Sequence, residues 1–337
     1  SSNYVLAADI DLSQNPAEQG WEPVGTGSNP FAGVFDGNGY VINNLKINRT
    51  ADYIGLFGYA NTATLKNLTV KNINITGKAN VGGLAGVLEN STITDCSVMG
   101  DVTGTDSDIG GLVGESLAGS TITKSYAVGN VSGDSSIGGI AGTNSGTISN
   151  TYATGMLQGN SDTGGLTGKN EAGGSIAFSY SACKMSGSGN SGGLVGYKAD
   201  TATVSECYWN TKDNDSLNSI GNDAALLTDA GKDEADLKMG ATYSGWDFMT
   251  TWGINSEDNG GFPFLLWQDF TPAVVSVSVT GSTSVGENLT AVPTPALSSM
   301  NYAWLRADTA DGEYTRIENA NQSTYTLTAD DFGKHIK

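Results

Sequence analysis

Small and apolar residues recur along this chain in a short cassette: a glycine, a leucine or isoleucine, one further residue and a second glycine. The first glycine of the cassette falls at residues 55, 83, 111, 139, 165 and 193, so successive copies are 28, 28, 28, 26 and 28 residues apart. A fixed period between about 20 and 50 residues is typical of proteins built from stacked repeats. The pattern therefore predicts a repeat architecture.

A second segment with alternating polar and apolar residues follows most cassettes. Its copies span residues 92–100, 121–129, 147–155, 175–183 and, in shortened form, 203–209. Each repeat thus holds about three short strands between corners rich in glycine and asparagine, and such strands bury their apolar side chains only when the repeats stack. The sequence predicts an all-β fold, a right-handed parallel β-helix (β-solenoid) with coils of about 28 residues. A leucine-rich repeat of strands and helices is the competing solution, but no ten-residue amphipathic stretch separates the cassettes.

Aligned copies of the repeat predict which side chains face inward. The cassette leucine is replaced only by isoleucine, and one strand position holds only serine, threonine and cysteine, so we expect both columns inside. The three cysteines, Cys96, Cys183 and Cys207, are expected as separate buried thiols, because Cys96 and Cys207 lie four coils apart, about 19 Å.

Alternation places one tyrosine per coil on the outer surface. The residues of this column are Tyr126, Tyr152, Tyr180 and Tyr208. Rings stacked about 4.8 Å apart would form a ridge that supports a sugar ring or a partner protein. We take these four tyrosines as the candidate ligand-binding residues; the alternative is that ring stacking only stabilises the coil.

The repeat also divides the chain into regions. Residues 1–270 form the solenoid, with an irregular N-terminal part (1–75), in which residues 31–39 resemble a degenerate cassette, regular repeats (76–210) and a C-terminal cap (211–270) whose aromatic residues cover the last coil. A short helix is expected within residues 224–238. Alternation after Pro272 predicts a β-sandwich, and residues 271–337 form an incomplete immunoglobulin-like domain, because about 100 residues are usual.

Composition narrows the possible partners. Asp and Glu number 35 against 16 Lys and Arg, giving a formal net charge of −19. This charge disfavours nucleic acid and anionic membrane surfaces as partners, and no apolar run is long enough to insert into a membrane. The absence of a leader before Ser1 favours a mature exported chain or a fragment.

The cassettes at residues 110–114 and 192–196 resemble the GLUG repeat of bacterial surface proteins. Residues 31–39, 207–210 and 261–268 fit that class too, and the tail, with Trp304 and Asp311-Gly312, resembles immunoglobulin-like modules of bacterial surface proteins. The resemblance implies an exported protein at the bacterial cell surface that acts as a stalk or adhesin. GLUG repeats also accompany the catalytic domain of immunoglobulin-A-cleaving metallopeptidases, so an accessory region of a larger enzyme is a further possibility.

Candidate catalytic groups are few. The single histidine, His335, lies outside the solenoid, which leaves no histidine for a catalytic triad or metal cluster there. Carboxylates that stack between coils, Asp106 with Asp134, are the candidates for polysaccharide cleavage. An acidic loop with Asp213 and Asp215 offers oxygen ligands for Ca²⁺; no other cofactor is expected.

The sequence thus predicts a non-enzymatic, extracellular or cell-surface structural or adhesion protein. Its expected partner is a host or neighbouring-cell surface protein or glycan, or another copy of itself. The alternatives are a carbohydrate-binding or polysaccharide-cleaving β-helix module and a subunit of an extracellular layer or filament.

Overall fold

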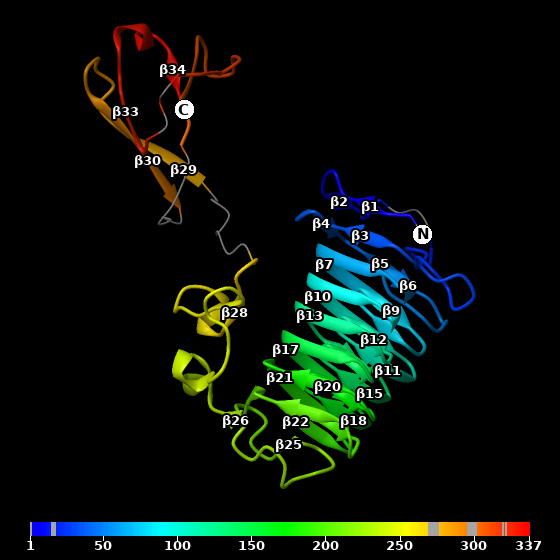
Figure 1. Ribbon diagram of the computed structural model, residues 1–337. Helices are drawn as coiled ribbons and strands as arrows, with labels where there is room; N and C mark the ends of the chain where they lie inside the picture. Colours follow the sequence, from blue (N-terminus) through cyan, green and yellow to red (C-terminus); the bar gives the residue numbers. More distant parts are fainter. Residues whose placement is uncertain (1, 15–17, 269–275, 295–301, 319, 321) are drawn as a thin grey trace. The chain divides into compact units, whose positions relative to one another are not determined.

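The computed structural model describes residues 2–14, 18–268, 276–294, 302–318, 320 and 322–337. The chain divides into two compact units, residues 1–268 and 269–337. The first unit is a parallel β-solenoid of about eight turns, which confirms the predicted fold class. Figure 1 shows its coils stacked from the N-terminal strands in blue to the green coils that end near residue 220.

Two parallel sheets run along the solenoid within the described residues. The larger sheet has fifteen strands: β1 (Tyr4–Val5), β2 (Ile10–Asp11), β3 (Val34–Asp36), β4 (Val41–Asn43), β5 (Lys46–Asn48), β7 (Thr64–Gly77), β10 (Thr92–Gly104), β13 (Thr121–Val128), β14 (Val131–Ser132), β17 (Thr147–Gly159), β20 (Ser175–Ala177), β21 (Tyr180–Gly187), β23 (Thr203–Ser205), β24 (Tyr208–Asn210) and β26 (Gly231–Lys232). The second sheet has eleven: β6 (Phe57–Asn61), β8 (Val81–Gly82), β9 (Ala85–Glu89), β11 (Ser107–Gly110), β12 (Val113–Ser116), β15 (Ser135–Gly138), β16 (Ala141–Asn144), β18 (Ser161–Gly164), β19 (Thr167–Asn170), β22 (Ser191–Lys198) and β25 (Asn218–Ile220).

The register of the strands reproduces the sequence period. The glycines directly before the cassettes pair in order, Gly110 with Gly138, Gly138 with Gly164 and Gly164 with Gly192, so equivalent residues stack coil upon coil. The inward columns are also as predicted, since the cassette leucines and isoleucines from Leu84 to Leu194 are completely buried. The three cysteines are free and buried, which confirms the expectation of three separate thiols.

The glycines of the cassette are required because the solenoid is narrow there. A methyl group on Gly139 would lie 2.5 Å from the Cβ atom of Ala153 and 2.4 Å from the carbonyl oxygen of Gly165. A methyl group on Gly193 would lie 1.9 Å from the ring of Trp209. Since Ala153 and Trp209 belong to one column on the opposite wall, only hydrogen fits between the two walls at the level of the cassette.

From the coil of β10 onwards, each coil bends within the larger sheet at one residue with a left-handed backbone. The column is Asp95, Lys124, Asn150, Phe178 and Glu206, with φ between 46° and 52°. The side chains of this column are varied, which is what a solvated position tolerates. The structure shows a corner, and the bend lets the residues two before and one after it both point inward, as Ile93 and Cys96 do with no exposed surface.

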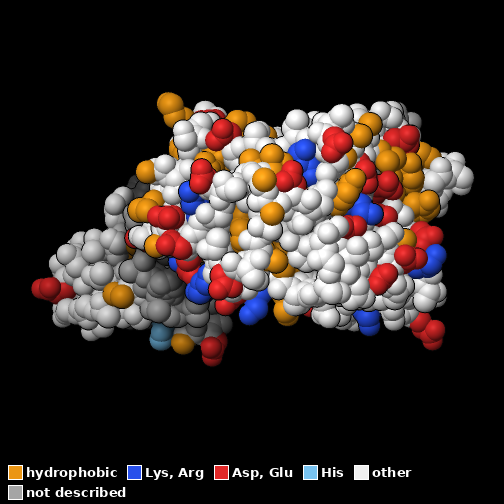
Figure 2. Space-filling model, turned by 90° about the horizontal axis from the view of Figure 1, so that it is seen from below, with side chains coloured by type: hydrophobic (Ala, Val, Ile, Leu, Met, Phe, Trp, Pro, Cys, Tyr) orange, Lys and Arg blue, Asp and Glu red, His pale blue; other side chains and the backbone are white. Residues whose placement is uncertain are grey.

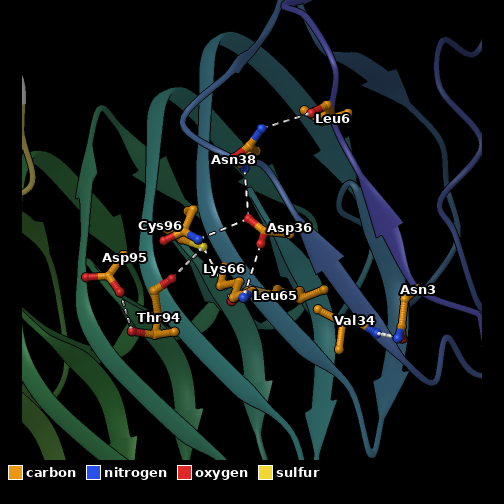
Figure 3. A network of polar contacts seen from close by, with 11 residues as sticks. Asn3, Leu6, Val34, Asp36, Asn38, Leu65, Lys66, Thr94, Asp95 and Cys96 are labelled. Carbon is orange, nitrogen blue, oxygen red and sulfur yellow. Dashed lines mark hydrogen bonds and ion pairs between the residues drawn. The ribbon is translucent and has the colours of Figure 1, made fainter.

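The N-terminal coils are displaced from the predicted alignment. Val34 pairs with Thr64, and Val24 forms a bridge with Phe57 of the first cassette, so residues 31–39 occupy the strand after the cassette. The prediction that they form a degenerate cassette is therefore wrong. It rested on glycines that serve turns, such as Gly39 with φ of 80°. Asp36 joins this coil to the next by an ion pair with Lys66 at 3.1 Å (Figure 3).

Residues 211–268 contain little regular structure. A short helix, α1 (Glu234–Leu237), lies within the segment predicted to hold one, and two 3₁₀ turns follow, η1 (Gly240–Thr242) and η2 (Asn259–Gly261). Strands β27 (Trp252–Gly253) and β28 (Phe264–Leu265) form an antiparallel pair. Among the described residues, no helix is long and apolar enough to cross a membrane.

The second unit contains two three-stranded antiparallel sheets in its described part. They consist of β29 (Ser276–Gly281), β30 (Asn288–Thr294) and β33 (Thr324–Thr326), and of β31 (Leu305–Ala307), β32 (Thr315–Arg316) and β34 (His335–Ile336); the turn η3 (Ala329–Asp331) precedes β34. Leu289, Trp304 and Leu327 form its small core. The immunoglobulin-like assignment stays a prediction.

Candidate functional site

The predicted tyrosine column exists and is stacked. The rings of Tyr126 and Tyr152 lie 4.7 Å apart and 3° from parallel, and those of Tyr152 and Tyr180 lie 5.0 Å apart and 5° from parallel. Tyr208 continues the strand register but packs against Tyr243 edge-on at 5.2 Å. The repeat therefore predicted correctly which side chains leave the coil on this face.

The tyrosine ridge is nevertheless not exposed. Tyr126, Tyr152 and Tyr180 expose 5%, 1% and 0% of their surface, and Tyr208 is partly buried. Residues 237–268, which we call the aromatic cover, pack over the column, and Figure 1 shows the segment with β28 beside the coils of β17 and β21. The prediction of an exposed ridge is wrong because alternation shows which side chains leave the coil, but not what lies above them.

Three tryptophans attach the aromatic cover to three different coils. The indole nitrogen of Trp267 donates to the carbonyl oxygen of Lys124 at 2.8 Å, and that of Trp246 donates to the carbonyl oxygen of Glu206 at 3.0 Å. The indole of Trp252, which is completely buried, donates to the side-chain oxygen of Asn150 at 3.2 Å. All three acceptors belong to the left-handed corner column. The aromatic cover therefore binds equivalent positions of different coils.

The tyrosine hydroxyl groups have partners within the aromatic cover. Tyr180 donates to the carbonyl oxygen of Pro263 at 2.8 Å and accepts from the amide of Asn259 at 2.9 Å, and Tyr152 accepts from Gln268 at 2.7 Å. Burial raises the pKa of Tyr152 and of Tyr180 well above the ordinary value. These hydroxyls are therefore neutral donors and acceptors held in place, and they are not available to a ligand while the cover is bound.

The aromatic cover also differs in position from the predicted cap. It was expected to cover the end of the last coil, but it lies on the side of the coils. The end of the hydrophobic core is instead packed by Leu217, Leu226, Leu227 and Ala230 from the loop before α1.

The candidate calcium ligands do not form a cluster in the structure. No group of three or more side chains suited to holding a metal occurs among the described residues. Asp213 and Asp215 flank Asn214, whose amide donates to the carbonyl oxygen of Cys183 at 2.7 Å and whose oxygen accepts from the backbone of Met185 at 3.0 Å. This loop is thus attached to the solenoid through Asn214, and calcium binding stays a prediction.

The candidate carboxylates for cleavage do lie in adjacent coils. The backbone nitrogen of Asp134 donates to the carbonyl oxygen of Asp106 at 3.1 Å, and the Asp134 carboxylate accepts from Asn160 at 2.9 Å. A second pair of acids, Asp108 and Glu115, lies on the other sheet and was missed by the sequence reasoning. Burial and the charge of Asp108 raise the pKa of Glu115. Its carboxylate accepts from Asn80 at 2.9 Å.

A groove of about 440 Å³ lies between the aromatic cover and the solenoid. Lys184, Lys212 and Lys238 line it, and Glu234 bridges the last two, with ammonium to carboxylate distances of 2.5 and 2.7 Å. Lys212 and Lys238 lower the pKa of Glu234 to about 2, so its carboxylate stays ionised and forms an ion pair with both ammonium groups. On the face seen in Figure 2, acidic and basic side chains are scattered among hydrophobic side chains and white atoms of the backbone and of other side chains.

Comparison with known proteins places part of this architecture in a known motif. Residues 77–103, one coil of the solenoid, match the model of the GLUG motif. The chain is 43% identical over 72 residues to a "Putative Gly-rich membrane protein" of Evansella cellulosilytica, a match that covers 20% of this chain and 8% of that protein. It is 38% identical over 81 residues to "Halomucin" of Haloquadratum walsbyi, which covers 21% of this chain and 1% of that protein.

Among solved structures, the chain resembles an "IgA1 Protease" with a TM-score of 0.41 and 19% identity. The match covers 62% of this chain and 18% of that one. The chain therefore spans a small fraction of the length of each relative that it matches.

Proposed function

We propose that this chain is a structural segment of a bacterial cell-surface protein, a stalk or adhesin region without an enzymatic role of its own. The GLUG motif and the similarity to proteins named as a membrane protein and a halomucin support a place at the cell surface. About eight coils at about 4.8 Å each give a rod about 38 Å long.

The use of the repeating residues carries this proposal. The cassette glycines fit between two walls, the cassette leucines fill the core, and the tyrosine column binds the aromatic cover. Each of these columns therefore contributes to packing, which is what a rigid spacer needs. On this proposal the partner is a host or neighbouring-cell surface protein, a glycan or another copy of the protein.

Labelling of intact cells of the producing organism tests the location. Antibodies raised against residues 1–268 should label cells without permeabilisation, and external protease should remove the label. A signal that appears only after permeabilisation would contradict the proposal. Incubation of the purified chain with polysaccharides tests the second part, since any catalytic turnover would show that the chain is an enzyme.

A further inference from the structure

One face of the solenoid carries two parallel columns of short hydroxyl side chains. The first column is Thr64, Thr92, Thr121, Thr147, Ser175 and Thr203. The second column, two residues further along each strand, is Lys66, Thr94, Thr123, Ser149, Ala177 and Ser205. We call these twelve residues the threonine face; ten of them are threonine or serine.

The orientation of the threonine face follows from the residues between its columns. Ile93, Ile122, Ile148 and Ile176 separate the two columns in their strands and are completely buried. Because side chains alternate along a strand, their neighbours on both sides point out of the coil. The threonine face precedes the left-handed corner in each strand, whereas the tyrosine column follows it.

The residues of the first column are half-buried or exposed, and their hydroxyl groups have no hydrogen-bond partner within the described residues. Among the hydrogen bonds of the described residues, none involves the side chain of any of these six. The second column is partly occupied, because Ser149 donates to Thr123 at 3.1 Å and Thr94 donates to Asp95 at 2.9 Å (Figure 3). The first column is thus an unbroken line of available donors and acceptors.

The spacing of the threonine face is set by the fold. Equivalent hydroxyls in neighbouring coils lie about 4.8 Å apart, so six of them span about 24 Å along the solenoid, and the two columns lie about 6.6 Å apart. Lys66 carries the single charge among the twelve side chains. The face therefore presents a regular and almost uncharged array on a chain with a net charge of −19.

Other outward columns of the same sheet differ from the first column of the threonine face. The column of Lys71, Met99, Val128, Thr154 and Ala182 is mixed, and its apolar members Met99, Val128 and Ala182 pack against the aromatic cluster. A further column, Thr76, Thr103, Ser132, Gln158 and Ser186, is also rich in hydroxyls, as strand propensity favours. There, however, Thr103 and Ser132 pair with each other at 3.2 Å, and Ser186 donates to the carbonyl oxygen of Leu157 at 3.5 Å.

We propose that the threonine face binds an uncharged polysaccharide whose extended chain lies along the solenoid axis. Hydroxyl side chains both donate and accept hydrogen bonds, as sugar hydroxyls do, and a periodic array suits a polymer that repeats one unit. The lack of charge on the face matches an uncharged polymer. This inference goes beyond the proposed surface role and does not depend on it, since binding is measured with the purified protein.

Binding of the whole chain to swollen cellulose and to chitin tests the inference. The variant Thr92→Val/Thr121→Val/Thr147→Val removes three central hydroxyls and keeps the β-branched shape that suits a strand. The control is Thr103→Val, an outward threonine of β10 that lies outside the threonine face and already pairs with Ser132 at 3.2 Å. Polygalacturonate serves as a charged polymer for comparison, and thermal unfolding checks that each variant folds.

The wild-type chain should bind cellulose or chitin, and the triple variant should bind on the order of tenfold or more weakly, because it lacks three of the hydroxyl groups that would bond the polymer. The control should bind like the wild type. The proposal is overturned if the wild type binds neither polymer, if it prefers polygalacturonate, or if the folded triple variant binds unchanged. Dimerisation that the triple variant abolishes would instead assign the face to self-association.

Discussion

The narrow interior of the solenoid makes a strong prediction for Gly139→Ala. This glycine has an ordinary backbone conformation, so alanine meets no backbone strain there. Its methyl group would, however, lie 2.5 Å from the Cβ atom of Ala153 and 2.4 Å from the carbonyl oxygen of Gly165. Both distances are far below a normal contact, and one of the two atoms belongs to backbone in the next coil.

The expected cost is the balance of two effects. Alanine in place of glycine restricts the unfolded chain and stabilises by about 0.4–1 kcal/mol. Overpacking in a close-packed interior costs about 1–3 kcal/mol, and more when backbone has to move. Since the backbone clash with Gly165 has no easy relief, we expect Gly139→Ala to lower the free energy of unfolding by about 1–2 kcal/mol.

Guanidinium unfolding followed by far-ultraviolet circular dichroism measures this change. The matched control is Gly27→Ala, because Gly27 is exposed, has no positive φ and has no atom nearer than 4.0 Å to the added methyl group. The control should be neutral or slightly stabilising. In the double variant with Ala153→Gly, the side-chain clash disappears and the backbone clash stays, so part of the lost stability should return.

The reasoning fails if Gly139→Ala unfolds within 0.5 kcal/mol of the wild type, a margin typical of surface substitutions. It fails also if Gly27→Ala is equally damaging, since the effect would then belong to alanine in general. If the double variant has the same free energy of unfolding as Gly139→Ala, the two walls do not meet at Gly139 and Ala153.

Three further predictions concern buried or charged groups. Tyr180→Phe should destabilise by about 1–2 kcal/mol, because its buried hydroxyl makes two hydrogen bonds, whereas Tyr208→Phe should change the melting temperature little; thermal unfolding compares them. Burial raises the pKa of all three cysteine thiols to about 12, so they should resist iodoacetamide at pH 8 until the protein unfolds. The pKa of Glu234 is lowered to about 2, so its stabilising contribution is present above about pH 4.5 and lost as the pH falls towards 2. Lys212→Gln should raise that pKa, as measured by NMR titration.

The interior of the solenoid could be predicted from the sequence because it obeys a local rule. Every coil repeats the same contacts, so aligned copies report directly which positions tolerate variation. The column of Cys96, Ser125 and Thr151, for example, varies only among small side chains, and all three have no exposed surface. The left-handed corner escaped this reasoning, because Asp, Lys, Asn, Phe and Glu share a backbone angle there and not a chemical character.

The burial of the tyrosines could not be read from the repeat, because it depends on a segment outside the repeat. One signal was present all the same. In the two coils before Tyr126, the same strand position holds Ser97 and Thr69. The aromatic residue therefore occurs only in the four coils from Tyr126 to Tyr208. Since the aromatic cover contacts those same coils, tyrosine marks the coils that are covered.

The threonine column and the tyrosine column therefore have different consequences for function. In β13, Thr121 and Tyr126 lie on either side of the corner at Lys124, in one strand and one coil. The large aromatic ring contributes apolar area, and it is buried under the aromatic cover. The threonine offers little area to bury but keeps a free hydroxyl, and repetition turns that hydroxyl into a line about 24 Å long. The cover thus buries the tyrosines, whereas the threonine face is the surface on which the proposed polysaccharide would bind.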